Sequence, residues 1–264
     1  FVIFLEMQSQ HLKLDNFIFV CALDACSGLG FLQEGKQIHA SIVEAGSEQD
    51  FMMGTALVNF YGKCGSLLDA KIVFERMSSR DVVSWNALIS GYCHNNLLDS
   101  ALRSFVEMYS NNLNPTTITF ACVLKACANG CVLHEGTHIH NIIVTCCLEQ
   151  DPFVGNSLID LYAKCGSLND ACAIFNKLPT QDVVSYNAMI AGYAKHGHAK
   201  DALECFRKMQ CNGSIPDVIT FLCALKVCRE MVSSIKGIGI YTRRFLRGIW
   251  TSIFQSEALW SIFT

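Results

Sequence analysis

The stretch FMMGTALVNFYGKCGSLLDAKIVFERMSSRDVVSWNALISGY, residues 51–92, returns later in the chain as PFVGNSLIDLYAKCGSLNDACAIFNKLPTQDVVSYNAMIAGY, residues 152–193. The offset is 101 residues, and it aligns residues 16–116 with residues 117–217 without a gap. Of the 101 aligned residues, 41 are identical. Self-similarity at a fixed period is typical of repeat architectures, in which each unit stacks on its neighbours. We therefore interpret the chain as an array of repeats.

The 101-residue unit divides into three motifs of 35, 31 and 35 residues. The predicted motifs occupy residues 16–50, 51–81, 82–116, 117–151, 152–182 and 183–217. Residues 1–15 are expected to be the end of a preceding motif. The repeat register fades after Cys228, so residues 218–264 are expected to be a degenerate or truncated motif followed by an irregular basic tail.

Each motif is predicted to form two helices. The first half of residues 183–217 places apolar side chains at helical spacing, and so does the second half. These two stripes consist of Tyr186, Met189, Ile190 and Tyr193, and of Ala202, Phe206 and Met209. A single helix pair cannot bury both stripes, so successive pairs must stack. The sequence predicts an all-α fold, a right-handed α-solenoid of stacked antiparallel helix-turn-helix repeats.

The starts of the second helices have a recurring polar pattern. Ser66 is followed three residues later by Asp69, and Ser167 by Asp170. This spacing is that of a capping box, in which the first side chain bonds a backbone amide of the new helix. We therefore expect capping boxes at both places.

Composition limits the classes of function. The 264 residues are 51% hydrophobic and 16% charged, with a formal net charge of −3, which excludes a disordered tail. The balance of 20 Lys and Arg against 23 Asp and Glu argues against binding nucleic acid mainly through phosphates. Fifteen cysteines in a chain of this length favour a reducing compartment over a secreted disulfide scaffold. The chain starts at Phe1 with no leader pattern, and we interpret it as an internal piece of a longer product.

One segment matches a metalloprotease signature. HEGTH at residues 134–138 has the spacing of the zinc motif H-E-x-x-H. The equivalent block in the preceding copy is QEGKQ at residues 33–37, so both histidines replace glutamines within a repeat pattern. We interpret the match as a coincidence of the register and expect no metal, no cofactor and no catalytic residues. Deaminase, P-loop and hydrolase motifs were not found either.

The motifs resemble those of the pentatricopeptide repeat (PPR) family, specifically the plant PLS type with alternating P, L and S motifs. VVSWNALISGY and VVSYNAMIAGY, with ALxxFxxM, resemble P motifs at residues 82–116 and 183–217. LDAC…EGKQIHA and LKAC…EGTHIHN resemble L motifs, and the two CGSL stretches resemble S motifs. In this order residues 1–15 would end a partial P motif, and residues 218–264 would begin with a degenerate or truncated L motif. The resemblance covers residues 1 to about 228 and implies sequence-specific binding of single-stranded RNA in mitochondria or plastids, often in C-to-U editing. Nothing resembles an E or DYW extension, so another polypeptide or a missing C-terminal part of the product would supply catalysis.

The resemblance places base-reading residues at the fifth and last positions of each motif. The expected pairs are Thr55 with Asp81, Asn86 with Thr116, Asn156 with Asp182, and Asn187 with Asp217. Amide and hydroxyl groups beside an acceptor suit the polar edge of an unstacked base. A structural alternative is that these residues only cap helices at repeat junctions.

Weaker candidates complete the set of site residues. The L motifs pair the apolar Val20 with Asp50 and Ala121 with Asp151, and we expect them to be spacers. The second-position residues Val83, Phe153 and Val184 are expected to pack against base faces. Carrying the family's code over gives guanine for Thr55, a pyrimidine for Asn86 and uracil for Asn156 and Asn187. The implied RNA footprint is 5′-x-G-Y-x-U-U-3′. We expect neither a membrane nor DNA as a partner.

Two other interpretations remain open at this stage. Helical hairpins of about 34 residues also form tetratricopeptide-like scaffolds that bind proteins, although the motif lengths of 35 and 31 and the lack of W-x₂-L-G-x₂-Y argue against this. The array is also short enough to be a non-functional fragment of a longer PPR protein.

Overall fold

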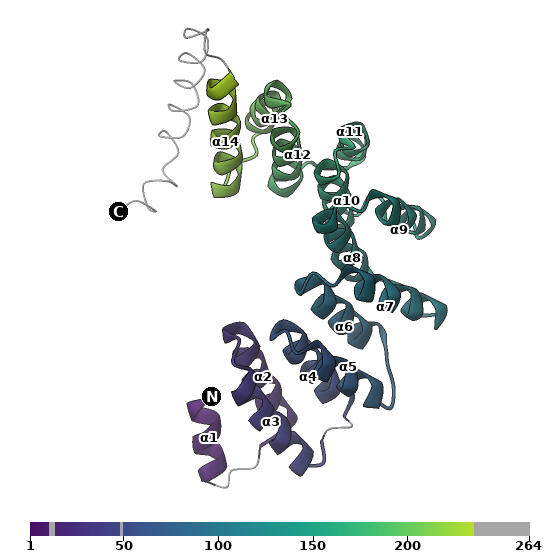
Figure 1. Ribbon diagram of the computed structural model, residues 1–264, viewed down its shortest axis with the longest axis vertical. Coiled ribbons are helices and arrows are strands. Elements are labelled where there is room, and N and C mark those ends of the chain that lie inside the picture. Colours follow the sequence, from purple (N-terminus) through teal and green to yellow (C-terminus); the bar gives the residue numbers. More distant parts are fainter. Residues whose placement is uncertain (11–13, 48–49, 235–264) are drawn as a thin grey trace. The chain divides into compact units, whose positions relative to one another are not determined.

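The computed structural model describes residues 1–10, 14–47 and 50–234, and the expected basic tail lies outside these described residues. All regular structure in the described part is α-helical, which confirms the predicted all-α class (Figure 1). The chain divides into two compact units, residues 1–148 and residues 149–264. In the described part, no helix is long and apolar enough to span a membrane.

The first unit contains nine helices within its described residues. They are α1 (Val2–Ser9), α2 (Asn16–Leu29), α3 (Leu32–Glu44), α4 (Phe51–Lys63), α5 (Leu67–Arg76), α6 (Val82–His94), α7 (Leu98–Ser110), α8 (Thr117–Gly130) and α9 (Leu133–Thr145). Helices α2 and α3, α4 and α5, α6 and α7, and α8 and α9 form hairpins. The first helices also pack on one another, in the order α2, α4, α6 and α8.

The second unit repeats this arrangement in its described part. Its helices are α10 (Pro152–Lys164), α11 (Leu168–Lys177), α12 (Val183–Lys195), α13 (Ala199–Cys211) and α14 (Val218–Ser234). Helices α10 and α11, and α12 and α13, form hairpins, and α10, α12 and α14 pack in a row. Each unit is thus a stack of helical hairpins, as a solenoid requires. The handedness of the whole array stays a prediction.

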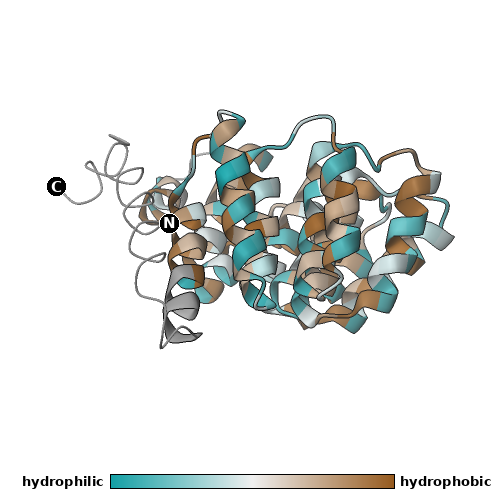
Figure 2. Cartoon of the chain, turned by 90° about the horizontal axis from the view of Figure 1, so that it is seen from above, coloured by the Kyte–Doolittle hydropathy of each residue, from teal (hydrophilic) through white to brown (hydrophobic). Residues whose placement is uncertain are grey.

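The hydrophobic core follows the predicted stripes. Tyr186, Met189 and Ile190 of α12 are buried, and so are Phe206 and Met209 of α13. Colouring by hydropathy shows that individual helices carry both apolar and polar residues, so each has one side suited to the interior (Figure 2). The described cysteines are all free thiols.

One aromatic contact recurs every 101 residues, between a helix and the first helix of the motif that follows. The ring centroids of Phe105 and Phe120 lie 6.0 Å apart, and those of Phe206 and Phe221 lie 6.2 Å apart. Phe4 and Phe19 make the equivalent contact at 5.9 Å. Tilted ring pairs at this separation contribute about 0.5–1.5 kcal/mol beyond the area they bury. Residues 101 positions apart in the sequence therefore do the same packing work.

The prediction of capping boxes at the second helices is wrong, because neither serine side chain bonds a backbone amide of its helix. Ser66 is the N-cap of α5, but its side chain makes no hydrogen bond to the helix backbone. Its Oγ instead donates to Asp69 Oδ2 at 2.7 Å, and Ser167 donates to Asp170 in the same way. Lys36 also contacts Asp69 Oδ2, at 2.9 Å. A capping serine accepts from a backbone N–H through its oxygen, but here each serine hydroxyl is turned to donate its proton to the nearby ionised carboxylate, which is a strong acceptor.

Candidate nucleic-acid interface

The last residue of each predicted motif caps the first helix of the next one. Each of these side chains accepts a hydrogen bond from a backbone N–H in the first turn. They are Asp15, Asp50, Asp81, Thr116, Asp151, Asp182 and Asp217. Such caps contribute about 1 kcal/mol each. The capping role considered as a structural alternative is therefore present at all seven positions.

Three of the four expected base-reading pairs are in direct contact. Asn156 Nδ2 donates to both carboxylate oxygens of Asp182, at 3.2 and 3.0 Å. Asn187 Nδ2 donates to Asp217 Oδ1 at 3.0 Å. These residues are 26 and 30 positions apart in the sequence, so the stacking of hairpins brings them together. Capping uses only part of each carboxylate, which leaves it able to hold the amide as well.

The third pair in contact lies in the first unit. Asn86 Nδ2 donates to Thr116 Oγ1 at 3.3 Å, a longer bond than the three contacts made to carboxylate oxygens. A neutral hydroxyl is a weaker acceptor than an ionised carboxylate, which agrees with the longer distance. The amide of Asn86 is thus held at the same place by a different acceptor.

Thr55 and Asp81 are the fourth expected pair, and they differ from the others. The Oγ1 atom of Thr55 is buried and has no hydrogen-bond partner among the residues that the structure describes. Asp81 uses Oδ1 to accept from the backbone N–H groups of Val83 and Ser84. A buried hydroxyl without a partner costs free energy until something supplies one.

The fifth positions of the predicted L motifs carry no polar group that could join such a pair. Val20 is half-buried on α2, and Ala121 is buried on α8. The acidic residues predicted beside them cap helices, since Asp50 accepts from Met53 N and Asp151 accepts from Val154 N.

A second set of side chains is apolar and exposed. Val83, Phe153 and Val184 are 57–58% exposed, although their size would normally favour burial. The second residue of every other described first helix is also a large exposed hydrophobic, and we did not single these residues out from the sequence. They are Phe17, Met52, Ile118 and Ile219. They occupy the same second position of their motifs as Val83, Phe153 and Val184, so the repeat register could have identified them.

The charge of one last-position residue is favoured by its hydrogen bonds. Burial alone would raise the pKa of Asp217, but the backbone N–H and side chain of Thr220 and the amide of Asn187 outweigh it and lower the pKa below its usual value. Asp217 is therefore an ionised, acceptor-only group at neutral pH.

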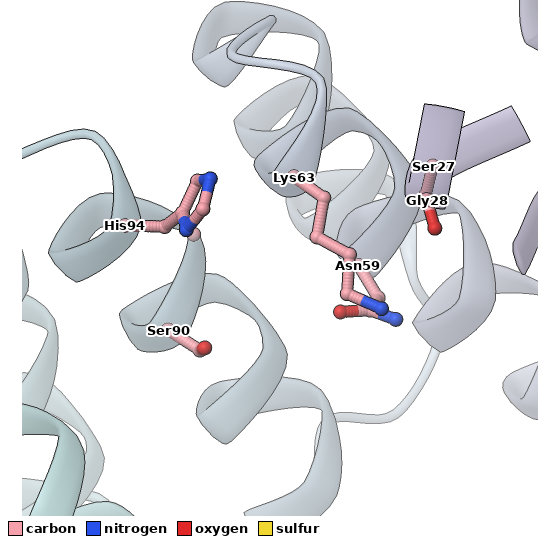
Figure 3. Close-up of a pocket in the computed structure, with 7 residues that line it drawn as sticks. Ser27, Gly28, Asn59, Lys63, Ser90 and His94 are labelled. Carbon is pink, nitrogen blue, oxygen red and sulfur yellow. The ribbon is translucent and has the colours of Figure 1, made fainter. Parts of the chain in front are cut away.

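In the first unit, a polar cavity lies near the C-terminal ends of the first helices, away from the N-terminal turns that carry the base-reading candidates. It has a volume of about 310 Å³ and is lined by Ser27, Gly28, Asn59, Lys63, Ser90, Gly91 and His94. Figure 3 shows these side chains coming from three neighbouring helices, α2, α4 and α6. Lys63 and His94 are both exposed there. The equivalent residues in the second unit are Lys164 and Lys195, so a basic group recurs at this position.

The HEGTH segment lies at the start of α9. His134 and His138 are exposed, and their rings meet edge to face with centroids 4.7 Å apart. Within the described part of the chain, no group of three or more His, Cys, Asp or Glu side chains is arranged to hold a metal ion.

Comparison with family models gives four matches along the chain. A model described as "PPR repeat family" matches residues 80–129 and 181–230, and a model described as "PPR repeat" matches residues 55–82 and 156–183. Together these matches cover more than half of the 264 residues.

The chain is also similar to two proteins of Arabidopsis thaliana. It is 33% identical over 93% of its length to pentatricopeptide repeat-containing protein At3g09040, mitochondrial, covering 24% of that protein. It is 33% identical over 86% of its length to pentatricopeptide repeat-containing protein DOT4, chloroplastic, covering 26% of that protein. The chain thus spans about a quarter of the length of these relatives.

A solved structure has the same fold. It is that of the pentatricopeptide repeat protein PPR10 in complex with an 18-nt psaJ RNA element. The match has a TM-score of 0.70 and 22% identity, and it covers 97% of this chain and 42% of PPR10. The repeat pattern, the helical hairpins and the family models agree, and the chain belongs to the pentatricopeptide repeat family.

Proposed function

We propose that this chain binds single-stranded RNA sequence-specifically, with its motifs reading bases through the fifth and last residues. The observation that carries the proposal is the pair of amide–carboxylate contacts, Asn156 with Asp182 and Asn187 with Asp217. An Asn Nδ2 has two protons, and the carboxylate accepts one of them. The second remains for an acceptor on a base edge.

The exposed apolar residues support the same proposal. Val83, Phe153 and Val184 each lie three residues before a fifth position, on the same helical face. An unstacked base placed against the polar pair would have its face beside such a side chain. Contacts of this kind tolerate any base, so they contribute affinity, and the polar pairs contribute the choice of base.

The basic groups around the cavity are suited to the RNA backbone. Lys63 and His94 lie about two helical turns beyond the fifth positions Thr55 and Asn86 on the same helices. We propose that they contact phosphates. With a net charge of −3, such contacts are few, and base edges carry most of the specificity.

The biological setting that we propose is an organelle. The relatives named above as mitochondrial and chloroplastic support a mitochondrion or plastid. We further propose that the motifs are of the PLS type with the boundaries given above, and that the chain is a non-catalytic adaptor in RNA processing. Recognition of C-to-U editing sites, with catalysis by another polypeptide, is the role that the PLS pattern favours.

A binding assay tests this function directly. The RNA should contain the proposed footprint 5′-x-G-Y-x-U-U-3′ in the centre of an unstructured strand, and the two uracils should be changed one at a time. Each change should weaken binding by about 5- to 100-fold, the usual effect of one mismatched hydrogen-bonding pair. Equal affinity for all these RNAs would contradict the proposal, and capture of proteins without RNA would favour a scaffold role.

A further inference from the structure

A buried hydroxyl group lies at the third position of four first helices, each in the motif that follows a polar fifth position. The four residues have no exposed surface; they are Ser84, Thr119, Ser185 and Thr220. The motifs that follow the apolar fifth positions Val20 and Ala121 have Met53 and Val154 at their third positions. The hydroxyls therefore accompany only the polar fifth positions.

Thr220 fixes the orientation of the Asn187 amide. Because Asp217 is ionised and only accepts, Asn187 must turn Nδ2 toward it and Oδ1 away from it. Thr220 Oγ1 lies 2.6 Å from Asn187 Oδ1 and accepts from the backbone N–H of Asp217 at 3.1 Å. Its proton also lies within reach of Asp217 Oδ1 at 2.8 Å, but the shorter contact is with the amide. The amide oxygen thus has a partner before any RNA is bound.

Thr119 does the same for Asn86 in the first unit. Thr119 Oγ1 accepts from the backbone N–H of Thr116 at 3.0 Å, and it donates to Asn86 Oδ1 at 2.6 Å. Asn86 Nδ2 meanwhile donates to Thr116 Oγ1. The two copies of this arrangement agree in every contact except the nature of the last-position acceptor.

Serine at the third position behaves differently. Ser185 Oγ donates to the backbone carbonyl of Asp182 at 2.8 Å, and Ser84 Oγ donates to that of Asp81 at 2.9 Å. Among the described residues, Asn156 Oδ1 and Thr55 Oγ1 are then left buried with no hydrogen-bond partner. The added methyl group of threonine restricts its χ1 angle, whereas serine turns freely toward its own helical turn.

Whether the third-position residue is threonine or serine decides which hydrogen-bonding group the fifth-position side chain has left for a base. Where threonine already satisfies the amide oxygen, the group that remains for the base is an N–H donor. Where serine leaves the buried amide oxygen of Asn156 without a partner, a base that donates a hydrogen bond to it is favoured, whereas the unpartnered hydroxyl of Thr55 can donate to a base or accept from it. A site with an unpaired buried polar atom rejects a non-matching ligand more strongly than a satisfied site does.

We infer that Thr119 and Thr220 are positioning residues that relax base selection at Asn86 and Asn187, and that serine at the same position makes selection stricter at Thr55 and Asn156. The inference rests on the proposed RNA binding. It also goes beyond the fifth and last residues, because Asn156–Asp182 and Asn187–Asp217 are identical pairs. Those two residues alone predict equal behaviour at the two sites, and the third-position residues Ser185 and Thr220 predict a difference.

The test uses the full chain and single-stranded RNAs that carry the footprint, with each of the four bases in turn at its fifth and at its sixth nucleotide. The range at one nucleotide is the ratio of the highest to the lowest Kd among the four bases. In the wild type, this ratio should be about tenfold larger at the fifth nucleotide, read by Asn156, than at the sixth, read by Asn187. The substitution Ser185→Thr should narrow the range at the fifth nucleotide. Thr220→Ser should widen it at the sixth. Thr180→Ser, on the exposed loop before Asp182, is the matched control and should change neither range.

The outcomes separate this inference from the function on which it rests. Equal ranges at the two nucleotides in the wild type, or ranges that the two substitutions leave unchanged, would overturn the inference while RNA binding stands. The wild-type comparison needs no variant, so it decides the matter even if a substituted chain fails to fold. Failure of the wild type to bind any of the RNAs would contradict the proposed function itself, and the inference with it.

Discussion

At the scale of single residues, some side chains at motif junctions cap a helix and also contact a fifth-position side chain. Asp182 caps α12 through Oδ1, which accepts from Ser185 N at 2.8 Å, and both of its oxygens hold the Asn156 amide. The helix cap and the proposed base-reading pair therefore share one carboxylate. A substitution that removes both tasks must be compared with one that removes only the charge.

Asp182→Ala and Asp182→Asn separate the two tasks. The alanine variant should lose about 1 kcal/mol of stability because the cap is gone, whereas asparagine caps nearly as well as aspartate. Both variants should change the base preferred at the Asn156 site, because neither offers an ionised acceptor to the amide. Thermal unfolding and binding to the footprint RNA measure the two effects. Unchanged base preference in the asparagine variant would contradict the reading role.

The ionisation of Asp217 gives a prediction about pH. Its pKa is lowered in the folded chain, so its contribution to stability is complete above the unfolded value, about 3.9, and is lost as the pH falls through the lower folded value. The stability difference between the wild type and Asp217→Asn should therefore be constant from pH 7 to 5 and should shrink below pH 4. Denaturant unfolding at several pH values measures it. A difference that grows in acid would contradict the assignment.

At the scale of helices and turns, two equivalent helix ends have the same left-handed backbone but different residues. The residue after α2 is Gly30, in the left-handed region with φ of 71°. At the equivalent place after α8, the residue is Cys131, with φ of 52°. A side chain in this region costs about 1–2 kcal/mol, and glycine avoids that cost.

Cys131→Gly should therefore stabilise the first unit, by up to about 1 kcal/mol after allowing for the greater freedom of glycine in the unfolded chain. The reciprocal change Gly30→Ala should destabilise it by a similar amount, although a Cβ there meets no atom within 4 Å. Cys131→Ala is the control, since it removes the thiol but keeps the strained φ. The midpoint of thermal unfolding checks all three, and equal stabilisation by alanine would show that the thiol is the cause.

Much of this element-level structure could be predicted from the sequence, because a gapless repeat fixes which residues are equivalent. The buried stripe of Tyr186, Met189 and Ile190 follows from helical spacing alone. The contact of Asn187 with Asp217 could be anticipated only through family resemblance, since the two are 30 residues apart. Bonding choices within a turn could not be predicted. Ser66 bonds Asp69 and not the backbone, and the roles of Thr119 and Thr220 depend on side-chain rotamers that a sequence pattern does not reveal.

At the scale of the whole molecule, low charge and a ladder of polar pairs indicate how binding should respond to salt. The basic groups that recur near the ends of the first helices include three lysines, Lys63, Lys164 and Lys195. If each neutralises one phosphate of a single strand, log K should fall with log salt concentration with a slope of about −2. Titrations between 50 and 300 mM KCl measure the slope. A much steeper slope, near −5 or beyond, would show that phosphate contacts dominate and would contradict base-edge reading.

Base reading by these motifs is best tested by selection of RNA with this chain from a pool of randomised single strands. The retained strands should share a guanine followed, three nucleotides later, by two adjacent uracils, as in 5′-x-G-Y-x-U-U-3′. The double substitution of Asn156 and Asn187 by alanine should abolish the enrichment of those two uracils and leave the guanine. Retained strands with no sequence in common, or a uracil preference that survives the double substitution, would contradict the claim that these motifs read RNA bases.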